Sequence, residues 1–255
     1  MLKKKRQQKY LIKRWLEIRR QLYAFSGSGN HDALHKLRVE IKKIRAFVKL
    51  YKGKIATTGQ LKAVRKIFHR AGIIREANIN LQMMKRLHIE QPVFNAEEKH
   101  AIQRESERFH LHPGRYEKHI RNNIRSLLKV IRPIRNRSIK HWFSRQLKAI
   151  AGIVAASSTD QFHLARKKIK RLIYIYGMLH KRLTHTLKIN IAYLDQLQDA
   201  IGEWHDTTVA AELLTDRNTG NKTALNRLRK EQDRAGVAIH TMGDDFLGKV
   251  HELRL

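Results

Sequence analysis

One helical pattern of basic and apolar residues occurs twice in this chain, about half a chain apart. The two copies read His35-x-x-Arg38-x-x-Ile41-Lys42-Lys43 and His163-x-x-Arg166-x-x-Ile169-Lys170-Arg171. His163 follows His35 by 128 positions, and a repeat at a fixed spacing indicates a duplicated structural unit. We therefore predict two tandem four-helix-bundle repeats, at residues 1–130 and 131–255, related by pseudo-two-fold symmetry and together forming one domain over residues 1–255.

Residues that break helices are scarce, which favours an all-α fold. The chain has three prolines and 13 glycines among 255 residues, and its apolar residues recur at helical rather than strand spacing. The expected helices cover residues 3–25, 31–51, the stretch after 59 as far as 88, the region after Pro92 with an interruption at 112–114, a segment starting at Pro133, and segments after 160, 187 and 221.

The net charge restricts the partners that this chain can have. With 54 Lys and Arg against 22 Asp and Glu, the formal charge is +32. A compact chain with this charge repels itself and is expected to bind a polyanion, such as nucleic acid, an anionic membrane surface or a phosphate polymer. Residues 1–130 carry 32 basic and 10 acidic residues, against 22 and 12 in residues 131–255, so the first repeat should contribute more of the attraction.

The helix expected at residues 31–51 carries its cations in one row. At about 100° per residue, a stripe about 80° wide holds His35, Arg38, Lys42, Arg45 and Lys49. A neighbouring arc, expected to be buried, holds Leu34, Leu37, Ile41, Ile44, Val48 and Tyr51. A basic row is often only a solvated face. Because like charges at i, i+4 disfavour a helix and Glu40 points away from the row, we interpret it as a ligand-binding surface.

The helix expected after residue 160 repeats this plan in a shorter form. His163, Arg166 and Lys170 take the same directions and Arg171 stands at the margin, but Ile173 replaces Arg45 and Gly177 replaces Lys49. Its buried face is expected to hold Phe162, Ala165, Ile169, Leu172 and Tyr176. Basic rows on other helices widen the predicted surface, and from these rows Arg14 and Lys66 join the candidate site residues.

The repeated basic motifs resemble those of a known family. The row His35-x-x-Arg38-x-x-x-Lys42-Lys43-x-Arg45 resembles the signature helix of the conserved histidine α-helical domain (CHAD) family, and the copy that begins at His163 is similar to its second-repeat signature. The segments Gly72-Ile73-Ile74-Arg75-Glu76 and Gly202-Glu203-Trp204-His205-Asp206 are similar to its Leu-Gly-x-x-Arg-Asp motif, although Arg75-Glu76 and His205-Asp206 are variants of it. The resemblance covers essentially the whole chain.

The resemblance implies an all-α domain of two four-helix bundles that binds inorganic polyphosphate through basic surface residues and can associate with polyphosphate granules. The polyphosphate-binding positions that it carries over are His35, Arg38, Lys42, Lys43, Arg45, His163, Arg166, Lys170 and Arg171. Some members are fused to a β-rich triphosphate-hydrolysing domain. This chain has no room for that domain, so we expect a stand-alone binder.

No motif for catalysis, a cofactor or a metal stands out, so we expect a protein that is not an enzyme. Cysteine is absent, which excludes disulfides, thiolate-bound metals and thiol catalysis. A phosphate-binding glycine loop, a serine elbow and a zinc-protease motif are also missing from the sequence.

No apolar run reaches 18 residues, so no membrane span is expected. No secretory-length apolar stretch follows the first residues, so we expect a cytoplasmic location.

Two other functions stay open on the sequence alone. The runner-up is an RNA- or DNA-binding helical protein, which the charge permits. Aromatic residues make up only 7% of the chain and are not interleaved with the basic rows, which disfavours a platform for stacking bases. The third candidate is an adaptor that docks on an acidic protein or an anionic granule.

Overall fold

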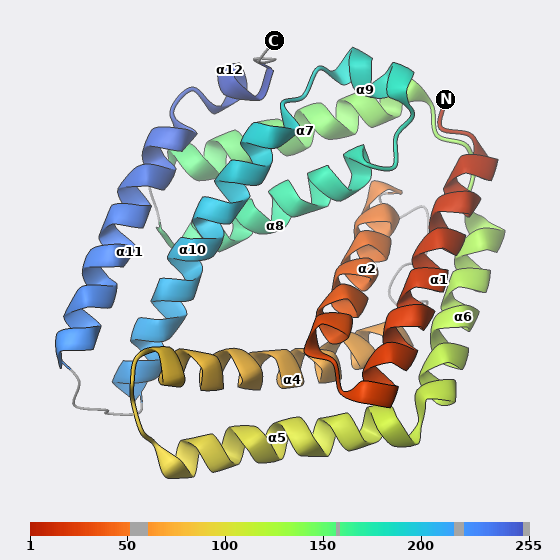
Figure 1. Ribbon diagram of the computed structural model, residues 1–255. Helices are drawn as coiled ribbons and strands as arrows, with labels where there is room; N and C mark the ends of the chain where they lie inside the picture. Colours follow the sequence, from red (N-terminus) through yellow and green to blue (C-terminus); the bar gives the residue numbers. More distant parts are fainter. Residues whose placement is uncertain (52–60, 157–158, 217–221, 252–255) are drawn as a thin grey trace. The chain divides into compact units, whose positions relative to one another are not determined.

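The computed structural model describes residues 1–51, 61–156, 159–216 and 222–251, and these ranges contain helices and no β-strand (Figure 1). One isolated bridge in the described residues pairs Leu2 with Ile134 in antiparallel fashion. The chain divides into two compact units, Met1–Ile134 (unit 1) and Arg135–Leu255 (unit 2). The all-α prediction is confirmed, whereas the internal duplication stays a prediction.

Unit 1 packs its long helices around one apolar core. Its described helices are α1 (Lys4–Ser28), α2 (His31–Leu50), α4 (Lys62–Arg86), α5 (Pro92–Leu111) and α6 (Pro113–Val130). Helix α1 packs against α2 and α6, while α4 packs against α2, α5 and α6. Phe25 and Phe109 meet edge to face at 5.3 Å in this core, a favoured aromatic geometry. Helix α4 therefore has α2 on one side and the α5–α6 pair as its other neighbours.

Unit 2 also consists of packed helices, some long and some short. Its described helices are α7 (Asn136–Ala155), α8 (Thr159–Tyr176), α9 (Lys181–Leu187), α10 (Ile191–Asp216), α11 (Lys222–Gly243) and α12 (Phe246–His251). Helix α10 packs against α8 and α11, and α7 packs against α8, α11 and α12. Phe162 of α8 meets Trp204 of α10 edge to face at 5.3 Å, which ties these two helices together.

Three features of the helix prediction need correction. The region after Pro92 is two helices rather than one interrupted helix, because Pro113 lacks the N–H that would continue the hydrogen-bond ladder of α5. Pro133 lies in a connection before α7, since Ile134 pairs its backbone with Leu2 at 2.8 and 3.1 Å. The short helices α9 and α12 are additions to the predicted set. The joints expected before the third, sixth and eighth predicted helices fall partly on residues 52–60, 157–158 and 217–221, which lie outside the described residues.

The joint between α1 and α2 shows why the basic row begins where it does. Gly29 has a φ of 67°, a left-handed conformation that ends α1, and its N–H donates to the carbonyl of Phe25 at 2.8 Å. The Asn30 side chain then caps α2 by accepting hydrogen bonds from the N–H groups of Asp32 and Ala33. These local signals fix the first residue of α2, and with it the direction of every later side chain.

The predicted buried face of α2 is confirmed, and that of α8 is confirmed in four of its five residues. All six apolar residues predicted on the α2 arc are buried, as are Phe162, Ala165, Ile169 and Leu172 on α8. Tyr176, at the end of α8, is half-buried. Burial of one face leaves the basic residues of each helix at its margin or in solvent, as the helical wheel predicts.

Candidate polyanion-binding surface

The basic row of α2 runs beside the interface that this helix makes with α4. His35, Arg45 and Lys49 are exposed, while Arg38 and Lys42 are half-buried. The row therefore mixes side chains that reach solvent with side chains that lie partly against the protein.

Arg38 is seated on α4 by three contacts. Its Nη1 donates to the carbonyl oxygen of Phe68 at 2.6 Å, and its guanidinium lies over the Phe68 ring, 4.2 Å from the centroid. A Cβ atom at Gly72 would stand 2.6 Å from Nη1, so the glycine provides the space that the guanidinium fills. Burial is the main reason that the pKa of Arg38 falls to about 10, and the charge of Arg75 lowers it as well. Arg38 thus has a structural role between two helices.

Arg45, which follows Arg38 further along α2, contacts the same Phe68 ring. Its guanidinium lies 5.1 Å from the Phe68 centroid. Partial desolvation at this position lowers the pKa of Arg45 below its usual value, and the positive charge of Arg65 has a smaller effect in the same direction. At the α2–α4 interface, Arg45 therefore feels the positive charge of Arg65, and Arg38 feels that of Arg75 together with the opposing charge of Glu76.

Unit 2 contains a corresponding arrangement between α8 and α10. Arg166 Nε donates to the carbonyl oxygen of Gln198 at 3.1 Å, and a Cβ atom at Gly202 would stand 2.6 Å from its Nη2. The accepting residue precedes its glycine by four positions, as Phe68 precedes Gly72 in unit 1. His163 also contacts α10, with its ring centroid 4.7 Å from that of His205.

These seated arginines and their glycines coincide with the matched region of a protein family. The model of the CHAD domain family matches residues 11–215, which include both arrangements. This chain belongs to the CHAD family. Among solved structures, the crystal structure of the CHAD domain from the plant Ricinus communis is similar, with a TM-score of 0.67 and 16% sequence identity over 98% of this chain and 92% of that one. At this identity the likeness shows the fold. A search of curated proteins gives no match.

In this CHAD domain, two predicted binding residues of unit 1 are partners of a buried carboxylate. Glu40, which is 5% exposed, lies 2.8 Å from Arg14 Nη1 and 2.6 Å from Lys43 Nζ. This ion-pair cluster joins α1 to α2. Glu40 lies off the basic row, as the wheel predicts, but the pattern does not reveal that it binds Arg14 and Lys43 together.

The remaining predicted residues are spread over other parts of the two units. Lys66 is exposed on α4 and lines a cavity between α4, α5 and α6, whose described lining contains no residue of α2. Lys170 and Arg171 are half-buried on α8. Hence His35, Arg45 and Lys49 are the predicted unit 1 residues that stand exposed in the α2 row.

Phe68 and Gln198 hold the two signature arginines of this CHAD domain and are not predicted from the sequence. Each contributes a backbone carbonyl to a signature arginine, and Phe68 adds its ring. Their one sequence signal is position, since each stands about one helical turn before the glycine of the third-helix motif. Carbonyl acceptors carry no residue-type signature, so this spacing is the only cue.

We expect Arg38→Ala to lower the free energy of unfolding by about 1.5 kcal/mol, because it removes a charged hydrogen bond and a cation–π contact. Arg38→Lys should lose most of the same free energy, since an ammonium lacks the planar guanidinium fork. Urea unfolding followed by circular dichroism measures both changes. Arg75→Ala, at an exposed position of α4, should shift stability by less than about 0.5 kcal/mol. If Arg38→Ala and Arg75→Ala behave alike, Arg38 has no structural role.

Proposed function

We propose that this CHAD domain binds inorganic polyphosphate along α2 and the adjoining face of α4, without a catalytic role. One observation carries the proposal: Arg38 and Arg45 of α2 lie over the ring of Phe68 on α4, and the α4 residues Arg65 and Arg75 add positive charge at this interface. Burial lowers the pKa of both Arg38 and Arg45; the charges of Arg75 and Arg65 lower these values further, while Glu76 acts in the opposite direction on Arg38. A fold that brings cations this close gains free energy when an anion binds between or along them.

The chemistry of the exposed residues suits a phosphate polymer. Polyphosphate presents about one negative charge per phosphate and no bases, so charge-assisted hydrogen bonds alone can hold it. Arg45 and Arg65 can fork phosphate oxygens, and Lys49 supplies a point charge. All three are exposed, and α2 and α4 hold them on rigid elements, so a long flexible chain can lie across them.

Unit 2 is proposed to contribute a weaker second surface on α8. Here His163, Arg166, Lys170 and Arg171 are half-buried, and Ile173 and Gly177 stand where α2 has Arg45 and Lys49. The second half of the chain also has the smaller net charge, which should weaken its binding to an anion further. Association with polyphosphate granules in the cytoplasm follows as part of the proposal, because a granule displays the same anion.

Nucleic acid is the alternative ligand, and the surface around Phe68 disfavours it. Stable binding of single strands normally needs aromatic rings on which bases stack. The Phe68 ring already carries the guanidinium groups of Arg38 and Arg45. The surface therefore offers charge without an open stacking platform.

A competition assay tests the proposed ligand. Labelled long-chain polyphosphate is bound to the full chain and displaced by unlabelled polyphosphate, RNA, double-stranded DNA or heparin at equal concentrations of charge. We expect polyphosphate to be the strongest competitor, and its affinity to fall steeply with salt because binding releases counterions. If RNA or DNA displaces the label more effectively, the proposal is wrong.

A further inference from the structure

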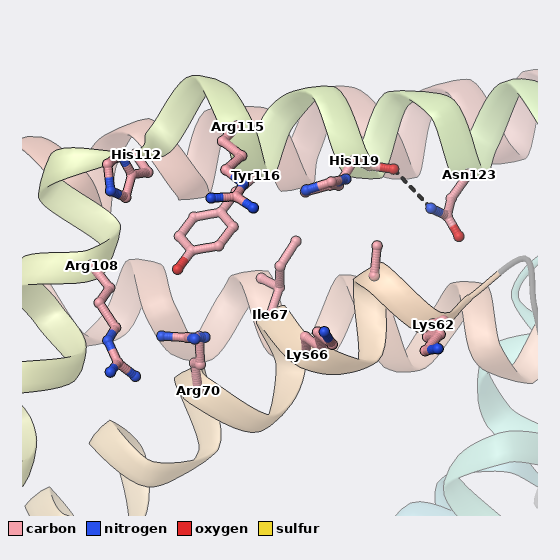
Figure 2. Close-up of a pocket in the computed structure, with 11 residues that line it drawn as sticks. Lys62, Lys66, Ile67, Arg70, Arg108, His112, Arg115, Tyr116, His119 and Asn123 are labelled. Carbon is pink, nitrogen blue, oxygen red and sulfur yellow. Dashed lines mark hydrogen bonds between the residues drawn. The ribbon is translucent and has the colours of Figure 1, made fainter.

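A second cationic site lies inside unit 1, in a cavity between α4, α5 and α6 (Figure 2). Its volume of about 590 Å³ lies within the range of roughly 300–1,000 Å³ that small-molecule sites occupy. Such sites are usually lined by apolar side chains. This lining has no Asp or Glu among the described residues and has five basic ones: Lys62, Lys66, Arg70, Arg108 and Arg115.

Two helices present these cations to each other across the cavity. On α4, Lys62, Lys66 and Arg70 follow one another at intervals of four residues and so share one face. On α6, Arg115 and His119 have the same spacing. Figure 2 shows the α6 side chains on one side of the space and the α4 side chains on the other. A ligand between them would meet cations from both sides.

A buried carboxylate positions two of the arginines at one end of the cavity. Glu105 is 3% exposed, and its carboxylate lies 3.2 Å from Arg70 Nη1 and 2.8 Å from Arg108 Nη1. It also lies 3.5 Å from Arg104 Nε, so one carboxylate forms ion pairs with three guanidinium groups. A guanidinium has five N–H donors, so an arginine held through one nitrogen can donate others to a ligand.

We propose that this cavity binds a short run of linked phosphate groups, at a site separate from the α2 row. The proposal does not depend on polyphosphate binding at α2. Arg70, Arg108 and Arg115 can fork phosphate oxygens, Lys66 can balance their charge, and the His119 ring can donate to them. The five formal charges of the lining, reduced by that of Glu105, leave an excess that adjacent phosphates neutralise.

The test titrates sodium tripolyphosphate into the full chain at physiological salt and measures heat. We expect the double variant Lys66→Ala, Arg115→Ala to bind tripolyphosphate about 30-fold more weakly, because two charged contacts are lost. This variant leaves Glu105 and its partners intact. The matched variant Lys99→Ala, Lys118→Ala loses the same charge at exposed positions of α5 and α6, and should bind within about threefold of the wild type.

Two results would overturn the site: no tripolyphosphate binding by the wild type, or equal affinity in the wild type and the cavity variant. The variant Arg45→Ala, Lys49→Ala separates this site from the α2 row. It should keep its tripolyphosphate affinity while it loses affinity for long-chain polyphosphate. If it keeps both affinities, the proposed function of the row is wrong and the cavity site stands.

The linked phosphates could be a free oligophosphate or the end of a long chain, and competition distinguishes these sources. Long chains with free ends and long chains with both ends amide-labelled are each tested against tripolyphosphate. Displacement by free-ended chains alone assigns the cavity to chain ends. Displacement by neither assigns it to free oligophosphate, and displacement by both assigns it to a run of phosphates within a long chain.

Discussion

Changing Arg45, Lys49 and Arg65 together to glutamate is expected to weaken long-chain polyphosphate binding by about 100-fold at physiological salt. The three residues are exposed on α2 and α4, and Arg45 lies over the ring of Phe68. Each exposed charge contact is worth up to about 1 kcal/mol, so the loss of three amounts to about 3 kcal/mol. The introduced carboxylates also repel the ligand. Fluorescence anisotropy with labelled polyphosphate measures the change.

The control for this variant carries the same change in net charge elsewhere in unit 1. Lys85, Lys99 and Lys118 are exposed on α4, α5 and α6, and changing them to glutamate should weaken binding by less than about tenfold. If the two variants lose affinity equally, binding depends on overall charge and the α2–α4 surface has no special role. Arg38 is left unchanged because its loss would disturb the helix interface itself.

Replacing Glu40 with alanine is expected to lower the free energy of unfolding by about 3 kcal/mol. Glu40 is almost fully buried and is the shared partner of Arg14 and Lys43. Removal of the carboxylate leaves two cations unpaired at the α1–α2 interface, and the side chain of Arg14 is only 13% exposed. Glu40→Gln should recover part of the loss, because the amide oxygen can still accept a hydrogen bond. Chemical unfolding of each variant gives the values.

Glu231 provides the matched control for Glu40. It pairs with Arg227 at 3.0 Å on α11, but that arginine side chain is 80% exposed. Exposed i, i+4 pairs contribute about 0.3–0.5 kcal/mol, so Glu231→Ala should change stability by no more than that. A Glu40→Ala variant as stable as Glu231→Ala would show that the Arg14–Glu40–Lys43 cluster contributes nothing to folding.

Local sequence was sufficient to predict most of the helices and nearly all of the buried residues of α2 and α8. Asn30 caps α2, Gly29 ends α1, and the apolar residues of α2 and α8 recur at helical spacing, so each signal depends on residues within a few positions. The predictions that were wrong concern connections and the short helices α9 and α12. Pro133 lies outside a helix because Ile134 pairs with Leu2, a residue more than a hundred positions away that no local pattern indicates.

The candidate site also has features that local sequence predicts and others that depend on contacts between helices. The wheel correctly puts His35, Arg45 and Lys49 in an exposed row, because helix geometry alone sets their direction. It does not distinguish them from Arg38, which is seated on Phe68, because that contact depends on how α4 approaches α2. Lys66 is a comparable case: its residue type suggests phosphate binding, but only the packing of α4 against α5 and α6 puts it in a cavity.

The amino-acid sequence by itself determined an all-α chain with a large positive charge, buried helix faces and two rows of cations beside them. The reason is that helix periodicity and residue type act over a few residues. Only the tertiary structure decided which cations reach solvent, which are bound by Glu40 or Glu105, and which sit on the carbonyls of Phe68 and Gln198. Those outcomes depend on contacts between separate helices, where burial makes an unpaired charge unfavourable and so selects a partner for it.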